Sequence, residues 1–147
     1  MISFDVNGCY PMVSINRPYQ LLFADDDAGF RQTLRLIFEP HFELHEACSG
    51  EHAVEIAEST HVDIVLLDMH MEEMTGIDTI RVIKGLHIGA PCILISGDAD
   101  DQLRREATDA AAFSVLKKPV RKAELVSTVS TALVDAYDDP DYLSELL

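Results

Sequence analysis

Four short apolar runs in this chain each end on polar side chains whose types suit phosphoryl transfer or metal binding. The runs and their polar ends are residues 21–24 with Asp25, Asp26 and Asp27, residues 64–67 with Asp68, residues 92–95 with Ser96, and residues 115–116 with Lys117, Lys118 and Pro119. If the runs are buried parallel strands, their ends meet along the carboxyl edge of one sheet, where open α/β folds place their sites. The pattern therefore predicts one crevice that holds carboxylates, a hydroxyl and an ammonium.

This set of groups could place a phosphoryl group on a carboxylate with the help of a divalent cation. Asp25, Asp26 and Asp68 would offer the hard oxygen ligands that Mg²⁺ or Mn²⁺ prefers. Because an attacking carboxylate and a phosphoryl group are both negative, the reaction needs that cation, a fixed ammonium and a hydroxyl donor. Asp68 would attack, Lys118 would be the ammonium and Ser96 the hydroxyl. Taken alone, the acidic triplet is ambiguous, since Asp27 could instead cap a helix.

Short apolar runs alternate along the chain with segments of helical periodicity. The predicted strands cover residues 21–24, 42–47, 62–67, 91–96 and 113–117. A first helix runs through residues 30–38 and ends at Pro40, and further helices are predicted over residues 50–59, 76–86, 99–111 and 121–137. Strands that alternate with helices indicate βαβ units. We predict an α/β fold, a doubly wound five-stranded parallel sheet of flavodoxin-like order 2-1-3-4-5, with its crevice between the first and third strands.

Apolar residues at helical spacing predict which side of two of these helices faces the sheet. In the helix over residues 76–86, the inward residues are predicted to be Ile77, Ile80, Val82 and Ile83. In the helix over residues 121–137, they are predicted to be Leu125, Val129, Leu133 and Val134. Gly85 or Gly89 is predicted to end the first of the two helices, because glycine readily takes the left-handed conformation.

The composition excludes several classes of function. The chain has 147 residues, and its 26 acidic and 11 basic side chains give a formal net charge of −15, which argues against direct nucleic-acid binding. No apolar stretch approaches the ~20 residues of a membrane span, and residues 1–18 lack the pattern of a signal peptide. Cys9, Cys48 and Cys92 lack metal-ligand spacing and are expected to be small buried residues in a reducing compartment. We therefore expect a cytoplasmic protein without membrane insertion.

The chain is expected to form one domain. Residues 19–137 contain all of the predicted strands and helices. Residues 1–18 have several turn-forming residues and no sustained period, so an irregular extension is predicted there. Residues 138–147 are predicted to be an acidic tail, and no effector domain is expected after residue 137.

Five segments, in order along the chain, resemble the receiver domain of two-component response regulators. They are residues 22–27 (LFADDD), 62–71 (VDIVLLDMHM), 74–76 (MTG), 93–96 (ILIS) and 116–119 (LKKP), within a resemblance over about residues 20–137. Asp25 and Asp26 match the metal-binding acids of the family, and Asp68 matches its phosphoacceptor. Ser96 matches its hydroxyl residue, and Lys118 matches the lysine of its Lys-Pro pair.

The resemblance implies that Asp68 takes a phosphoryl group from a sensor histidine kinase or a histidine phosphotransfer protein, with Mg²⁺. It implies that the backbone carbonyl of His70 completes the metal site and that the bond between Lys118 and Pro119 is cis. Such a domain promotes its own phosphorylation and dephosphorylation but is a signalling protein rather than an enzyme. Without an effector domain, we expect output through contacts with a downstream protein target, and homodimer formation is left open.

Three positions depart from the pattern of the family. Glu72 stands where proline is usual, and Gly97 stands where a small residue such as alanine is usual. Val115 stands where an aromatic switch residue is usual, and a short side chain with a stiff χ1 angle cannot swing as a ring does. His70 and Asp98 each follow a site residue by two positions, so each is either a neighbour of the phosphoryl group or an ordinary loop residue.

Three other functions compete with the phosphoacceptor. A haloacid-dehalogenase-like phosphatase would need a second Asp two residues after its nucleophile, where this chain has His70. A flavodoxin would need a Ser/Thr-rich phosphate loop where Asp25, Asp26 and Asp27 would repel phosphate. The third is a receiver-like module that binds proteins without being phosphorylated. The presence of all the expected acidic, hydroxyl and ammonium residues argues against it.

Overall fold

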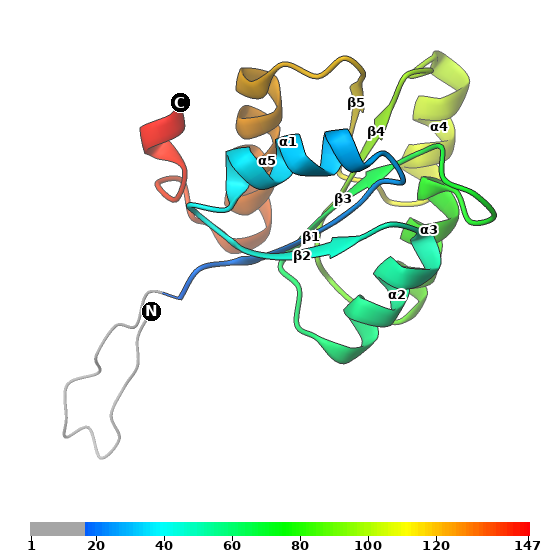
Figure 1. Ribbon diagram of the computed structural model, residues 1–147, viewed down its shortest axis with the longest axis horizontal. Helices are drawn as coiled ribbons and strands as arrows, with labels where there is room; N and C mark the ends of the chain where they lie inside the picture. The colour runs from blue at the N-terminus through cyan, green and yellow to red at the C-terminus, as the bar shows by residue number, and fades with distance from the viewer. Residues whose placement is uncertain (1–16) are drawn as a thin grey trace.

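The computed structural model describes residues 17–147, and these form a parallel sheet of five strands in the order β2-β1-β3-β4-β5 (Figure 1). The strands are β1 (Gln20–Ala24), β2 (Glu43–Ala47), β3 (Ile64–Asp68), β4 (Cys92–Ser96) and β5 (Ser114–Lys117). The predicted α/β class and strand order are confirmed. The order reverses between β1 and β3, which are neighbours in the sheet with Ala24 opposite Leu67.

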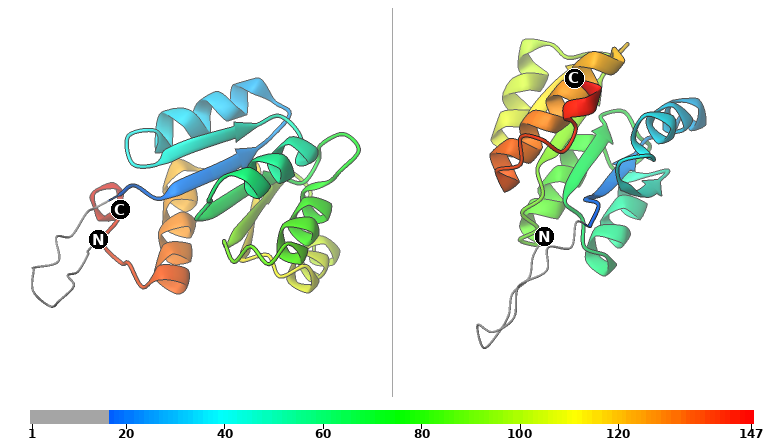
Figure 2. Two further views of the ribbon diagram at one scale, coloured as in Figure 1. Left: turned by 90° about the horizontal axis from the view of Figure 1, so that it is seen from below. Right: turned by 90° about the vertical axis from the view of Figure 1, so that its left-hand side faces the viewer.

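Five helices cover the two faces of the sheet (Figures 1 and 2). They are α1 (Ala28–Phe38), α2 (Gly50–Ser59), α3 (Gly76–Gly85), α4 (Asp101–Asp109) and α5 (Lys122–Tyr137). Side chains alternate between the faces of a strand, so Leu22 packs toward α2, α3 and α4 while Phe23 packs toward α1 and α5. Both faces are therefore buried, as the continuous apolar strands predict.

The helices begin on polar side chains that accept hydrogen bonds from the first helical N–H groups. Asp27 caps α1 by accepting from the Gly29 N–H, and Asp100 caps α4 by accepting from the Leu103 N–H. Thr75 and Asp78 form a reciprocal capping box at the start of α3. These caps follow the carboxyl ends of β1, β3 and β4, so they also set the path of the loops that carry the site.

Two of the predicted inward residues are wrong. Val82 on α3 and Val134 on α5 point away from the sheet and keep 37% and 40% of their surface exposed. Each helix buries only the side chains that face the sheet. An apolar residue at the edge of that face therefore stays at the surface. Cys92 is buried as predicted, which raises the pKa of its thiol to about 11, whereas Cys48 is exposed, contrary to prediction.

The helix and strand boundaries also differ by a few residues from those predicted. The helix α3 ends at Gly85, and the left-handed residue that follows is His87, with φ 61°, rather than a glycine. The strand β3 starts at Ile64 instead of residue 62, because the Asp63 carboxylate accepts a hydrogen bond from the Gln20 N–H. The helix α4 starts only at Asp101, after its cap, and is shorter than residues 99–111.

Part of the segment predicted as an acidic tail, residues 138–147, packs against the domain. Leu143 is buried in the core on the side of α1 and α5, and a short 3-10 helix, Ser144–Leu146, follows it. The Tyr142 ring contacts the rings of Tyr19 and Phe42. Figure 2 shows this segment beside the start of β1. Most of the predicted extension over residues 1–18, including Cys9, lies outside the described residues.

Candidate functional site

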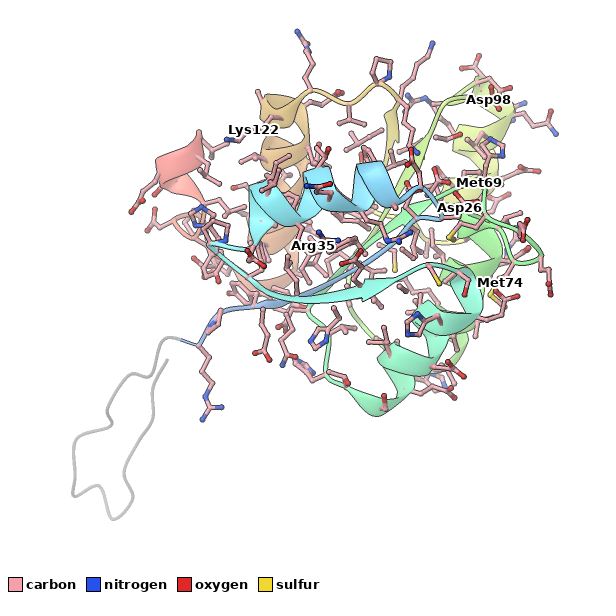
Figure 3. The ribbon with its side chains drawn as sticks, viewed as in Figure 1. Asp26, Arg35, Met69, Met74, Asp98 and Lys122 are labelled. Carbon is pink, nitrogen blue, oxygen red and sulfur yellow. The ribbon has the colours of Figure 1, made fainter. Side chains whose placement is uncertain are left out.

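The polar residues predicted to share one edge of the sheet do so. Asp25 and Asp26 follow β1, Asp68 ends β3 and Ser96 ends β4, and Lys118 follows β5. Since the strands are parallel, their carboxyl ends lie at one edge. Figure 3 labels Asp26, Met69 and Asp98 at this edge, at the ends of three different strands.

Three carboxylates form the centre of the site. Oxygen atoms of Asp25, Asp26 and Asp68 all lie within 4.8 Å of one another. Asp25 and Asp68 are 1% and 5% exposed, whereas Asp26 is open to solvent. Burial raises the pKa of Asp68, and repulsion by Asp25 and Asp26 adds to this, together outweighing the hydrogen bond from Lys118. The site therefore holds negative charge that favours the arrival of a cation.

Lys118 joins two of the carboxylates. Its Nζ lies 2.9 Å from Oδ1 of Asp68 and 3.1 Å from Oδ2 of Asp25. The same ammonium lies 4.5 Å from the centre of the Phe30 ring, which holds it over α1. Burial alone would lower the pKa of Lys118, but the hydrogen bonds to Asp68 and Asp25 outweigh it and raise that pKa. Lys118 therefore remains charged, and its bond to Pro119 is cis.

Ser96 lies at the end of β4 with its side chain fully buried. Its hydroxyl accepts a hydrogen bond from the Asp98 N–H at 3.0 Å, and its carbonyl accepts one from the Lys118 N–H at 2.9 Å. These two bonds connect the hydroxyl residue both to the loop before α4 and to the lysine. A movement of Ser96 would therefore act on both segments.

His70 and Asp98 approach each other at the rim of the site. Nε2 of His70 lies 3.0 Å from Oδ2 of Asp98, and the two side chains are 60% and 76% exposed. The pair connects the loop after β3 with the loop after β4. Its exposure makes it weak as an ion pair, so it is better described as two polar side chains that border the site.

Val115 packs partly buried against the core on the side of α4. The Arg104 guanidinium on α4 donates to the Val115 carbonyl and to the Ala99 carbonyl, each at 3.3 Å. Arg104 was not singled out from the sequence, because nothing in its spacing indicates a contact with β5. It connects the loop after Ser96 with the strand that carries Val115.

Gly76 allows α3 to start directly beside Asp68. A Cβ atom at this position would lie 2.6 Å from the Asp68 carbonyl oxygen and 2.5 Å from a methyl carbon of Leu94. Only glycine fits such a close approach of helix and strand. The sequence showed the turn at residues 74–76 but not this contact, which depends on how α3 packs.

The three carboxylates fit a divalent metal ion of the magnesium type. They are hard oxygen donors at one point, and the exposed Asp26 leaves access for the waters that Mg²⁺ retains. They contain no sulfur or imidazole ligand of the kind that softer metals favour. The chemistry of the donors therefore agrees with the divalent cation that the sequence predicts.

Comparison of the sequence with known proteins shows the family to which this chain belongs. A sequence model described as the response regulator receiver domain matches residues 21–130. The sensor kinase CckA of Brucella abortus is 36% identical over 115 residues, which are 77% of this chain and 12% of that protein. The cell cycle transcriptional regulator CtrA of Caulobacter vibrioides is 25% identical over 111 residues, which are 75% of this chain and 48% of that protein. This chain thus spans about half the length, or less, of these curated relatives.

Solved structures agree with the sequence comparison. The CheY4 chemotaxis protein of Vibrio cholerae has the same fold, with a TM-score of 0.76 at 21% identity over 80% of this chain and 100% of that one. The structure of the CheX–CheY complex of Borrelia burgdorferi gives a TM-score of 0.75 at 29% identity over 80% of this chain and 90% of that one.

The fold and the family match define a signalling domain of two-component systems. The chain belongs to the response regulator receiver domain family. Within residues 17–147, no helix combines the length and the apolar character that crossing a bilayer requires.

Proposed function

We propose that this protein accepts a phosphoryl group on Asp68 and signals through contacts with other proteins. The donor would be the phosphohistidine of a sensor kinase or of a histidine phosphotransfer protein. An Asp68 oxygen attacks phosphorus, and the new O–P bond forms as the P–N bond to the histidine breaks. The imidazole nitrogen of the donor keeps the electron pair and takes up a proton. The product is an acyl phosphate on Asp68.

One observation carries this proposal: the Lys118 ammonium bridges Asp68 and Asp25 at the edge of the sheet, in a chain of the receiver family. The contact places a fixed positive charge beside the attacking carboxylate. At ~4 Å and an effective dielectric of ~20, such a charge interacts by about 4 kcal/mol with an anionic oxygen. That is enough to orient a phosphoryl group.

The remaining residues complete the charge balance. Asp25, Asp26 and Asp68, with the backbone carbonyl of His70, would hold Mg²⁺ or Mn²⁺, which would supply positive charge to the phosphoryl oxygens. The CheX–CheY complex of Borrelia burgdorferi, which contains a chain 29% identical to this one, has been solved with BeF3 and Mg²⁺, which supports the assignment of magnesium. Ser96 would donate its hydroxyl hydrogen to a phosphoryl oxygen.

The domain would also promote loss of the phosphoryl group by hydrolysis. Water would attack phosphorus, and Asp68 would leave as the carboxylate. His70 and Asp98 border the site, so they would influence how water reaches it. We propose that the chain acts as a cytoplasmic phosphorelay or regulatory component with a downstream protein target, without binding nucleic acid directly.

The competing functions have less support. A haloacid-dehalogenase-like phosphatase would need an acidic group where His70 stands. A protein-binding module without phosphorylation would have no need for Lys118 to lie between two carboxylates whose burial is costly. The buried acids and the lysine therefore favour the phosphoacceptor.

Phosphorylation can be tested with a small donor. We expect intact-mass measurement after incubation with acetyl phosphate and Mg²⁺ to show one added phosphoryl group, and none when EDTA replaces Mg²⁺. The Asp68→Asn variant should show no adduct, because the amide cannot attack phosphorus. The matched control is Asp135→Asn, which removes an exposed carboxylate from α5 and should leave the adduct unchanged.

Two results would contradict the proposal. One is an adduct that persists in Asp68→Asn, and the other is a wild-type protein that gains no phosphoryl group from acetyl phosphate or from a phosphohistidine protein. Sustained release of phosphate from a small phosphomonoester would instead favour the phosphatase.

A further inference from the structure

Every polar atom of Asp25 has a hydrogen-bonding partner. Its N–H donates to the Ala47 carbonyl at 3.3 Å, and its Oδ1 accepts from the Asp27 N–H at 2.8 Å. Its Oδ2 accepts from Nζ of Lys118 at 3.1 Å. Its carbonyl oxygen accepts from the guanidinium of Arg31 at 2.7 Å. The last of these bonds comes from Arg31, a residue of α1 that was not among those predicted to form the site.

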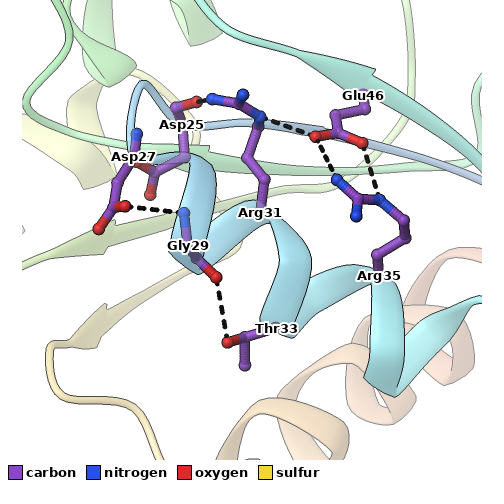
Figure 4. Close-up of polar contacts among 7 residues, drawn as sticks. All are labelled: Asp25, Asp27, Gly29, Arg31, Thr33, Arg35 and Glu46. Atoms are coloured by element: carbon purple, nitrogen blue, oxygen red, sulfur yellow. Dashed lines mark hydrogen bonds and ion pairs between the residues drawn. The ribbon is translucent and has the colours of Figure 1, made fainter.

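Arg31 is held in place from its other side. Its Nε donates to Oε2 of Glu46 at 2.7 Å, so one guanidinium spans from the end of β1 to β2 (Figure 4). The Arg31 side chain is only 18% exposed. A planar guanidinium bound through both Nε and a terminal nitrogen has little freedom to rotate, which makes the carbonyl contact a fixed one.

Glu46 is shared with a second arginine. Arg35, one turn further along α1, donates to both carboxylate oxygens of Glu46 at 3.0 and 2.9 Å (Figure 4). Hydrogen bonds from Arg35 and then Arg31 lower the pKa of Glu46 against the effect of burial, so the carboxylate stays ionised. The two arginines therefore bind the same carboxylate, but only Arg31 also reaches Asp25. This difference provides a natural control.

We propose that Arg31 is a positioning residue for the divalent cation, acting through the carbonyl of Asp25, and this rests on the proposed function above. Holding that carbonyl fixes the peptide between Asp25 and Asp26. Within residues 17–147, no hydrogen-bond donor contacts the Asp26 carboxylate, so its direction depends on that peptide. Arg31 thus sets where the exposed acid of the site points, without touching the cation.

The test compares two substitutions that keep the positive charge. In Arg31→Lys, a single ammonium cannot span Glu46 and the Asp25 carbonyl, whereas Arg35→Lys weakens only the bonds to Glu46. We expect titration calorimetry on the full chain to show Mg²⁺ affinity lowered about tenfold in Arg31→Lys, in the range that outer-sphere changes cost. In Arg35→Lys, the affinity should stay within about twofold of wild type.

A second measurement is made without metal. The Asp27 N–H donates to the Asp25 carboxylate, so its hydrogen exchange reports how firmly Asp25 is held. Exchange of the Asp27 amide should therefore be faster in Arg31→Lys, which loosens Asp25, and unchanged in Arg35→Lys. Urea unfolding of both variants measures the loss of global stability separately, because Arg31→Lys affects bonds to Glu46 and to the Asp25 carbonyl whereas Arg35→Lys affects bonds to Glu46 alone. A purely structural role for Arg31 would change unfolding and leave Mg²⁺ affinity alone.

Equal Mg²⁺ affinities in the two variants, or unchanged exchange of the Asp27 amide in Arg31→Lys, would overturn the inference. The outcome is separable from that of the proposed function. Absence of Mg²⁺ binding in the wild type would count against the proposed metal site, while the exchange measurement would still show whether Arg31 holds the loop. Equal Mg²⁺ affinity in the wild type and in Arg31→Lys would contradict only the proposed role of Arg31 and would leave the proposed metal site intact.

Discussion

At the scale of single residues, the three carboxylates of the site place unfavourable negative charge close together. Asp68 is buried beside two other carboxylates, and Lys118 offsets only part of the cost, so the pKa of Asp68 is raised. An acid with a raised pKa in the folded protein binds its proton more tightly when folded than when unfolded. Its contribution to stability is therefore present at low pH and is lost as the pH rises through the folded pKa.

Removing this charge should stabilise the metal-free protein. We expect Asp68→Asn in EDTA to raise the free energy of unfolding at pH 7 by about 1 kcal/mol, a size usual for single substitutions. The gain should shrink as the pH falls toward ~4, where an unfolded aspartate takes up its proton. Urea unfolding at several pH values measures it, with Asp135→Asn as the exposed control. A less stable Asp68→Asn at pH 7 would show that the Lys118 contact dominates.

At the scale of elements, the segment between β4 and α4 connects the site to the rest of the domain and would report the proposed phosphorylation. It begins at Ser96, continues through the exposed Gly97, where an added Cβ would meet no atom within 4 Å, and ends at α4. Arg104 connects it to β5 by contacting the Ala99 and Val115 carbonyls. Val115 cannot act as a swinging ring, so a signal from Ser96 would travel through this segment.

We expect phosphorylation to change hydrogen exchange mainly in residues 97–111. Movement of Ser96 toward the phosphoryl group would shift the loop, and with no ring to bury, the coupling should lie toward the low end of ~1–3 kcal/mol. Exchange is compared with and without acetyl phosphate, and Asp68→Asn treated in the same way serves as the control. A response centred on residues 113–117, or a change in partner affinity well above a hundredfold, would place the switch elsewhere.

At the scale of the whole molecule, the carboxyl-terminal segment closes the end of the domain opposite the site. The Tyr19 N–H donates to the Tyr142 hydroxyl at 3.1 Å, and the Tyr19 hydroxyl donates to Asp139 at 2.8 Å. Tyr19 also stacks on Tyr137, with ring centres 5.3 Å apart. With Leu143 buried beneath them, these contacts join the start of β1 to the end of α5 and make the segment part of the fold.

Truncating the buried side chain of this segment should therefore destabilise the domain. We expect Leu143→Ala to lower the free energy of unfolding by about 2–3 kcal/mol, since Leu143 is 1% exposed. Leu147→Ala, at a position 66% exposed, should change it by less than about 0.5 kcal/mol. Urea unfolding compares the two. Because the segment lies at the end of the domain opposite Asp68, phosphorylation by acetyl phosphate should persist in both variants. Equal free energies of unfolding for Leu143→Ala and Leu147→Ala would contradict the burial of Leu143.

The sequence alone was sufficient for the sheet order and for the set of groups at its edge. Continuous apolar runs are typical of parallel strands that are buried on both faces. Each run was followed by a carboxylate, a hydroxyl or an ammonium side chain. Parallel strands bring such ends together whatever the details of packing. Asp25, Asp68 and Lys118 could therefore be predicted as neighbours, and Asp27 as a candidate helix cap.

Only the tertiary structure decided which side chains reach across elements. The sequence around Arg31 does not indicate its contact with Glu46, which forms only because α1 packs beside β2. Likewise, nothing in the sequence of the carboxyl-terminal segment indicates that Leu143 is part of the core. Val82 and Val134 fit the helical period but lie beyond the edge of the contact with the sheet. Periodicity and strand ends are local properties that neighbouring residues encode, whereas these contacts depend on distances between segments that are far apart in the chain.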